Sequence, residues 1–433
     1  MLLCWAAVRN LLGYRQVDIG KRDEHGRDAL WFAAANGHDE VVKLFVDMDG
    51  YEIDQPDDEG RTPLACAVQE NHVSTARLLL RTSRVNPNSM TRHKETPLII
   101  AVDRGLLDMV NELLTAKKLD LNAGRLFLTE EDALLLSVKK KDVDIFMSLL
   151  KSGKPVNLSA VERVGHTVVH ELVLKGFDKT LLMLLESRDV EIDTFNNGGL
   201  TPLAEAVFCG RFSTCRILLE KGKADASLGD GTFGNPLEIA ASHGHTAILK
   251  LLLEEGKAEV DGISPPCERS HTPLLNAARQ GNLEAVRLLL QKGADPNRPD
   301  GINGGTALHV AIRSAYGTYD VVQELLKHAH VNIELKNNEG RTPLSVAASK
   351  KGSRFAQMLL DKGADLYSED EAGMTPIDWA KADCRQATLA ILESKRDAMA
   401  KQQDTSATDS NAGHSEAANS NHSGEPGCNS LKD

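Results

Sequence analysis

The sequence predicts an all-α repeat protein, a solenoid of about eleven helix-turn-helix units with β-hairpin loops between them. The first of three observations is a Thr-Pro-Leu motif, or a close variant, that returns every 33 to 37 residues. The second is a pair or triplet of leucines about 15 residues after most of these motifs. The third is composition, since 41% hydrophobic but only 4% aromatic residues suit thin layers of Leu, Val and Ala. The proline of the motif, or its substitute, falls at Ala29, Pro63, Pro97, Ala133, Val168, Pro202, Pro236, Pro273, Ala307, Pro343 and Pro376. A unit this short cannot bury its own apolar face, so we expect stability to come from stacking on neighbours.

The unit that begins at His271 has the clearest elements. Thr272 stands where a helix N-cap is wanted, because its hydroxyl can accept a hydrogen bond from an otherwise unpaired N–H. The proline after it suits the first helical position. The small pair Ala277-Ala278 lets adjacent helices approach closely, and Gly281 is predicted to end the helix in a left-handed conformation. Leu288-Leu289-Leu290 then form the buried stripe of a second helix.

These features resemble those of the ankyrin-repeat family, whose units begin Thr-Pro-Leu-His and recur at about 33 residues. The resemblance runs from about Asp23 to about Glu393. It implies that hairpin tips and first-helix faces lie along one concave surface, and that this surface binds another protein. It also implies that His170 and His309, in the fourth position of the motif, are structural. Most units replace that histidine, as Trp31 does, so we expect a thinner network of hydrogen bonds between units than in an idealised array.

We predict three parts along the chain: a partial or remnant repeat in residues 1–22, the array in residues 23–396, and a disordered polar tail in residues 397–433. The first part is apolar where a terminal repeat should be polar. This leaves open the interpretation that the chain is a fragment of something longer. From Lys401 onward the tail has one large aliphatic residue, which buries too little apolar area to offset the entropy of ordering.

The array is degenerate around residues 120–195. The unit at Asp132 has no Thr-Pro, and Lys141 stands where a helix-ending glycine belongs. The next unit keeps Thr167 and lacks the proline. Because capping devices contribute on the order of 1 kcal/mol each, we predict that this segment is the least stable part of the array.

Charge and cysteine content exclude several classes of function. The balance is acidic, 50 Lys and Arg against 62 Asp and Glu, which argues against direct nucleic-acid binding. The one basic run, Lys139 to Lys141, is followed by acids and is interpreted as a solvated loop. Seven cysteines without a Cys-x-x-Cys are expected to be free thiols, and no metal site is predicted. No apolar run reaches the roughly 18 residues of a membrane span. We expect a monomer inside the cell, in the cytoplasm rather than the nucleus.

No catalytic constellation emerges, so we predict neither enzymatic activity nor a cofactor. The run Gly301 to Gly305 suggests a phosphate loop but lacks the Gly-Lys-Ser/Thr ending, and is interpreted as a hairpin tip. Acidic groups at other tips, such as Asp57-Asp58 and Glu369-Asp370-Glu371, are expected to be solvated.

The favoured function is a protein–protein interaction scaffold or adaptor that binds a partner on the hairpin tips and first helices. The alternative is the recognition part of a larger signalling or receptor protein whose N-terminal enzymatic or nucleotide-switch domain is absent from this chain. Candidate partner-binding residues are the variable positions beside each tip glycine, together with Trp31, because Trp is favoured at interface hot spots. They are Glu24, His25, Arg27, Trp31, Asp58, Glu59, Arg61, Arg92, His93, Glu95, Asn196, Asn197, His271, Asn338, Glu339 and Arg341.

Overall fold

The structure is a computed structural model that describes residues 18–124, 131–161, 163–229, 234–262, 271–314, 318–350 and 353–412, with side chains as far as residue 401. The described residues form 22 α-helices in eleven successive pairs, and no strand is assigned among them. The pairs are α2 (Ala29–Ala35) with α3 (Asp39–Val46), α4 (Pro63–Gln69) with α5 (Val73–Leu80), α6 (Pro97–Asp103) with α7 (Leu107–Leu114), α8 (Ala133–Lys139) with α9 (Val143–Lys151), α10 (Val168–Lys175) with α11 (Asp178–Ser187), α12 (Pro202–Phe208) with α13 (Phe212–Glu220), α14 (Pro236–His243) with α15 (Thr246–Glu254), α16 (Pro273–Gln280) with α17 (Leu283–Gln291), α18 (Ala307–Arg313) with α19 (Tyr319–Lys327), α20 (Pro343–Ser349) with α21 (Ser353–Asp361), and α22 (Pro376–Ala382) with α23 (Gln386–Ala412). The predicted number of units and their all-helical class are confirmed.

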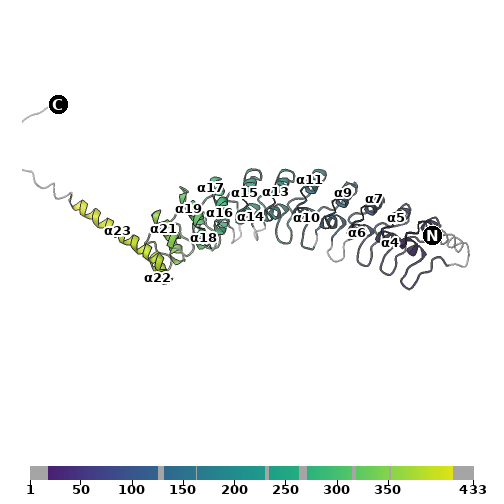
Figure 1. The fold of residues 1–433 in the computed structure, drawn as a ribbon, viewed down its shortest axis with the longest axis horizontal. Coiled ribbons are helices and arrows are strands. Elements are labelled where there is room, and N and C mark those ends of the chain that lie inside the picture. Colours follow the sequence, from purple (N-terminus) through teal and green to yellow (C-terminus); the bar gives the residue numbers. More distant parts are fainter. Residues whose placement is uncertain are drawn as a thin grey trace, which may run out of the picture. The chain divides into compact units, whose positions relative to one another are not determined.

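Packing divides the chain into two compact units, one of residues 1–240 with 245–265 and the other of residues 241–244 with 266–433. In the first unit the first helices of each pair, α2 to α12, contact one another in succession, and second helices such as α3, α5, α7 and α9 form a parallel row (Figure 1). In the second unit α16, α18, α20 and α22 form one row and α17, α19, α21 and α23 the other. The turns that join one pair to the next lie at the edge of the first-helix row, and we call them the tips.

Leucine, valine and alanine fill the space between the two rows of helices. Leu79 of α5 and Leu98 of α6 have no exposed surface, and neither has Leu289 of α17. Burying a leucine side chain contributes about 2 kcal/mol, so the stacked pairs supply the core that no single pair could build.

Helix starts and ends follow the motif. In six pairs the threonine hydroxyl accepts a hydrogen bond from the backbone N–H three residues later, as predicted for a cap. The six are Thr62, Thr96, Thr201, Thr272, Thr342 and Thr375. Gly281 ends α16 with a φ of 76°, the left-handed conformation that glycine adopts without strain.

The degenerate segment is better capped than the sequence suggested. The Asp132 carboxylate accepts the Leu135 N–H at 2.8 Å and caps α8, and Asp142 does the same for Ile145 at 3.0 Å. Thr167 forms a reciprocal capping box with the imidazole of His170. The premise that this segment lacks caps was therefore wrong, because aspartate replaces threonine. Backbone strain remains at Lys141, whose φ of 63° is left-handed.

The basic run Lys139 to Lys141, at the end of α8, is not simply a solvated loop. Lys139 is the last residue of α8, and its ammonium lies 2.6 Å from the Glu131 carboxylate. Lys140 forms an ion pair of 2.8 Å with Asp103 of α6. The second ion pair links α8 to the neighbouring first helix α6, whereas the first lies within the fourth pair.

The last helix is longer than any other described. Helix α23 continues through residue 397, where the sequence predicted that a disordered tail begins, and it ends at Ala412. The predicted remnant repeat falls largely on residues 1–17, outside the described part, and so do residues 413–433 of the tail.

Candidate functional site

Five of the described tips are closed in the same way by their first residue. The Asp57 side chain accepts the backbone N–H of Glu59 at 3.0 Å and of Arg61 at 2.7 Å, while its own N–H donates to the Arg61 carbonyl at 3.0 Å. The same geometry is made by Asp23, Asn196, Asn337 and Asp370. The expectation that tip acids are solvated was wrong for Asp57 and Asp370, which are 6% and 9% exposed because they satisfy turn N–H groups.

Successive tips are joined by backbone hydrogen bonds. In the first unit the Asp58 N–H donates to the His25 carbonyl at 3.0 Å, and the Arg92 N–H donates to Glu59 at 2.8 Å. In the second unit the Asn338 N–H donates to Asn303 at 2.9 Å. The predicted partner-binding residues therefore lie at corresponding places on a regular frame within each unit. We call the tips and the exposed side of the first helices the tip face.

Nine of the sixteen candidate residues are exposed on this frame. They are Glu24, His25, Asp58, Glu59, Arg92, His93, Asn197, Asn338 and Glu339. Arg27, Arg61, Glu95, His271 and Arg341 are half-buried, immediately before the first helix of their pairs. Trp31 and Asn196 are buried. Asn196 closes its own turn, so its side chain is a structural part of the tip.

Trp31 has a structural role that the sequence analysis missed. It is 9% exposed, and its indole N–H donates to the Arg61 carbonyl of the next tip at 3.2 Å. His170 and His309 make the same bond from the same position, to Leu200 at 3.1 Å and to Arg341 at 2.9 Å. Burial lowers the pKa of His170 to about 4, so this imidazole is neutral near pH 7. Tryptophan thus substitutes for the family histidine.

Two arginines flank the Trp31 ring. The guanidinium carbon of Arg27 lies 5.4 Å from the ring centroid and that of Arg61 lies 5.5 Å from it. Each arginine is also paired to the aspartate that begins its own tip, Arg27 with Asp23 at 2.7 Å and Arg61 with Asp57 at 2.8 Å. The exposed aromatic beside them is Phe32, 41% exposed, which lies 4.8 Å from the Arg27 guanidinium carbon.

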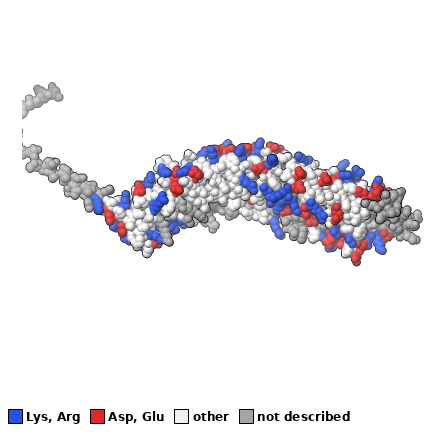
Figure 2. Space-filling model, in the orientation of Figure 1, with Lys and Arg blue, Asp and Glu red and all other residues white. Residues whose placement is uncertain are grey.

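A cavity of about 290 Å³ opens on the tip face of the second and third pairs. Four of the candidate residues line it: Glu59, Arg61, His93 and Glu95. Its floor is the side of α6, where Ile99 and Ile100 lie beside Asp103 and Arg104. The walls carry both signs of charge, with an ion pair of 3.5 Å between Arg92 and Glu59 at the rim. Basic and acidic side chains also occur side by side on the face drawn in Figure 2.

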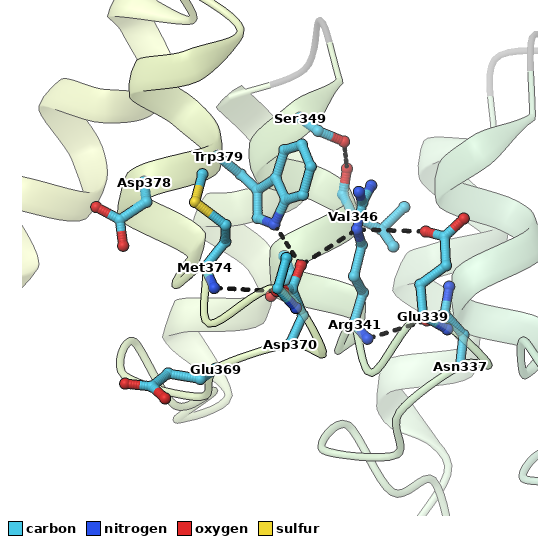
Figure 3. Close-up of polar contacts among 12 residues, drawn as sticks. Asn337, Glu339, Arg341, Val346, Ser349, Glu369, Asp370, Met374, Asp378 and Trp379 are labelled. Atoms are coloured by element: carbon cyan, nitrogen blue, oxygen red, sulfur yellow. Dashed lines mark hydrogen bonds and ion pairs between the residues drawn. The ribbon is translucent and has the colours of Figure 1, made fainter.

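The second unit has its own cluster on the tip face (Figure 3). The Arg341 guanidinium carbon lies 3.6 Å from the centroid of the Trp379 ring, close enough for a cation–π interaction. The Trp379 indole N–H donates to the Asp370 carboxylate at 2.7 Å, and Arg341 approaches the same carboxylate at 3.4 Å and Glu339 at 3.3 Å. Burial alone would raise the pKa of Asp370, but these hydrogen bonds and the charge of Arg341 lower it. Sequence reasoning did not find Trp379, which follows the fourth motif position directly, as Phe32 does in α2.

Sites for other chemistry are not evident in the described part of the chain. It contains no group of three His, Cys, Asp or Glu residues placed to hold a metal ion. None of its helices combines the length and the apolar character needed to cross a membrane. Four described cysteines are free thiols, and burial raises the pKa of Cys66 and Cys215 to about 12. The other three cysteines lie outside the described residues.

Comparisons with known proteins agree with this architecture. The family model described as ankyrin repeats (3 copies) matches residues 4–91, 49–125, 134–230, 223–300 and 299–370. The chain is 35% identical over 91 residues to Rabankyrin-5 from Homo sapiens and 30% identical over 122 residues to the human transient receptor potential cation channel subfamily A member 1. It is 32% identical over 121 residues to neurogenic locus notch homolog protein 1 from Xenopus tropicalis. These matches cover 21%, 28% and 28% of this chain but only 8%, 11% and 5% of the three relatives.

Proposed function

The chain belongs to the ankyrin-repeat family, and from this premise we propose that it is a non-enzymatic scaffold or adaptor that binds a partner protein on its tip face. Members of this family generally mediate protein–protein interaction. The observation that carries the proposal here is the cavity lined by Glu59, Arg61, His93 and Glu95, which occupy two tip positions whose residue type differs between these neighbouring repeats while the surrounding frame does not.

The physical basis is a rigid frame that presents variable side chains. The tips are fixed by the bonds from Asp57 and by the backbone bonds between neighbouring tips, so exposed residues such as Arg92 and His93 lose little entropy when a partner binds. Charges of both signs at the rim serve specificity and association rate more than affinity. Phe32 takes the place of Trp31 as the exposed aromatic contact, since Trp31 itself is buried.

The second candidate function is the recognition part of a larger signalling or receptor protein. It is supported by the relatives, in which the matched segment covers 5% to 11% of a longer chain. In that case the same tip face would bind the partner, and the enzymatic or nucleotide-switch domain would lie in another part of the longer protein. A longer transcript that continues in frame upstream would favour this candidate. The first candidate function, the scaffold or adaptor, includes the proposal that the protein is a monomer in the cytoplasm.

Two charge swaps test the proposal in a capture experiment from source-cell extract with quantitative mass spectrometry. Glu59→Arg with Arg92→Glu reverses an exposed ion pair on the tip face while it preserves net charge and the pair itself. Arg77→Glu with Glu112→Arg does the same to a pair of 2.8 Å on the second helices α5 and α7. A partner that binds the unchanged chain should be lost only with the first swap. A partner retained with both swaps, a partner lost only with the second, or no partner at all would contradict the proposal.

A further inference from the structure

Two buried carboxylates occupy the same place in consecutive first helices. Glu171 of α10 and Glu205 of α12 each follow the fourth motif position directly, and their side chains are only 5% and 8% exposed. Other pairs place apolar residues there, such as Leu136, Val310 and Val346. Burying a carboxylate costs several kcal/mol unless hydrogen bonds and an opposite charge compensate it. Two such groups in adjacent repeats therefore call for a specific explanation.

Glu171 is well compensated. Its carboxylate lies 3.2 Å from Nδ1 of His166 and 4.0 Å from the Lys175 ammonium. The positive charge of Lys139 on α8 also acts on it. Although burial alone would raise the pKa of Glu171, the hydrogen bond from His166 and these charges lower it. This carboxylate is therefore charged near pH 7.

The burial of the Glu205 carboxylate is not compensated by a hydrogen bond within the described part of the chain. Its Oε1 lies 3.8 Å from Nε2 of His166, beyond hydrogen-bonding distance, and its buried Oε2 accepts no hydrogen bond from any described group. Burial raises the pKa of Glu205 to about 7; the charge of His166 opposes this rise and the charge of Glu171 adds to it. An unpaired carboxylate that is more than nine-tenths buried is a costly feature in a structural role alone. A cation from outside would relieve that cost.

The surroundings suit a partner segment. Val164, in the same tip as His166, is 50% exposed, and Phe195, at the next tip, is 44% exposed; the Asn197 N–H joins these two tips by donating to the Val164 carbonyl at 3.1 Å. Phe208, three residues after Glu205 on α12, is 45% exposed. Apolar contacts around a desolvated charge are typical of interface hot spots, because they exclude water from it.

We propose that His166, Glu171 and Glu205 form a docking point for one lysine or arginine side chain of a partner protein, flanked by apolar residues of the same segment. The cation contacts Oε2 of Glu205 while His166, whose side chain is 17% exposed, stays on Glu171 and moves away from its long contact with Glu205. The inference rests on the proposed function, since it names the chemistry of a contact on the same tip face. It places this contact three to four repeats from the cavity at Glu59 and Arg61, within the same compact unit.

Four labelled pools of ten-residue peptides test the inference. Each pool has randomised apolar residues around a central residue that is arginine, lysine, glutamine or leucine, and fluorescence anisotropy measures binding to the full chain. We expect an arginine or lysine pool to bind at least tenfold more tightly than the glutamine and leucine pools. Glu205→Gln, which keeps the shape of the side chain, should abolish this preference. The matched control Glu220→Gln, at the exposed end of α13, should retain it.

A carboxyl-carbon NMR titration gives a second, site-specific readout. The pKa of Glu205 should fall by at least one unit when the preferred basic pool is bound, because a cation favours the charged form. Equal binding of the four pools, no binding of any pool, or a basic preference that survives Glu205→Gln would each overturn the inference. Failure of the proposed function is distinguishable, since it appears in the capture experiment as a partner insensitive to the Glu59/Arg92 swap.

Discussion

The indole N–H of Trp31 donates to the backbone carbonyl of Arg61 across 3.2 Å, so a tryptophan makes the bond between repeats that histidine makes elsewhere in the same chain. The bond joins α2 to the tip that precedes α4. It converts a residue that looks like an interface anchor in the sequence into a part of the frame.

Trp31→Phe should lower the local stability of the first pair by about 1 kcal/mol, because the Arg61 carbonyl loses its buried donor while most apolar contact remains. Amide hydrogen exchange of α2 measures the change. Phe32→Leu, at the neighbouring exposed position, is the control and should stay within about 0.5 kcal/mol of the unchanged chain. Equal effects of the two substitutions would mean that the indole bond contributes nothing.

Asp370→Ala should destabilise the last two pairs by about 3 kcal/mol or more. The substitution leaves the N–H groups of Ala372 and Met374 without their acceptor and removes the partner of both Trp379 and Arg341. Asp370→Asn should cost about 1 kcal/mol, since Asn337 closes the equivalent tip with an amide oxygen. Thermal unfolding and hydrogen exchange of the Met374 amide compare the two variants. Similar losses of stability for both would refute the role of the Asp370 side chain as an acceptor.

Lys141→Gly should stabilise the fourth pair by about 1 kcal/mol. Lys141 has a φ of 63°, a left-handed conformation that costs a residue with a side chain about 1 kcal/mol and costs glycine nothing. Lys140→Gly is the matched control: its φ is −70°, so glycine there should destabilise, and its ion pair with Asp103 is lost as well. Chemical denaturation measures both, and destabilisation by both would argue that Lys141 is not strained.

The raised pKa of Glu205 predicts that stability falls as pH rises. Between the unfolded value near 4.5 and the folded value of about 7, the folded chain holds a proton that the unfolded chain has released. The free energy of unfolding should therefore fall by on the order of 2 kcal/mol between pH 4.5 and pH 7 on account of this group.

The comparison with Glu205→Gln isolates that contribution, because every other titratable residue is the same in both proteins. The variant should lack this part of the pH dependence and be the more stable protein at pH 7. Denaturation curves at several pH values that run parallel for the two proteins would exclude a raised pKa.

Hydrogen exchange should find residues 131–195 less protected than residues 271–365. Caps are present in the first of these segments, so the expected cause is now the strain at Lys141 and the unpartnered carboxylate of Glu205, which lies 3.8 Å from His166 of this segment. Equal protection of the two segments would show that neither feature weakens the array.

The sequence was sufficient for the fold because the determinants are local. A threonine followed by proline begins a helix at Thr62 and at Thr272 for the same reason, and Gly281 ends one through its own backbone freedom. Because the motif recurs at a regular period, each helix pair then stacks on its neighbours. A cap made by a different residue type, such as Asp132, does not match the Thr-Pro motif and was therefore not predicted.

The tip face was predictable only in part, since its contacts between repeats join residues 30 or more positions apart. Exposed candidates such as His25 and Glu59 could be found beside the tip glycines. The burial of Trp31 and the packing of Arg341 on Trp379 could not, because both depend on the neighbouring repeat. Glu171 and Glu205 carry a detectable signal, acids in the same position of adjacent repeats, but the lack of a hydrogen bond to Oε2 of Glu205 is visible only in three dimensions.

Site-specific photo-crosslinking tests the central claim most directly. A photoreactive amino acid replaces His93, an exposed tip residue that lines the cavity, or Arg81, an exposed residue at the end of α5 in the second-helix row. The full chain is irradiated in source-cell extract, and adducts are identified by mass spectrometry. The account predicts a protein adduct from position 93 and none of the same protein from position 81. Adducts from position 81 alone, or from neither position, would contradict it.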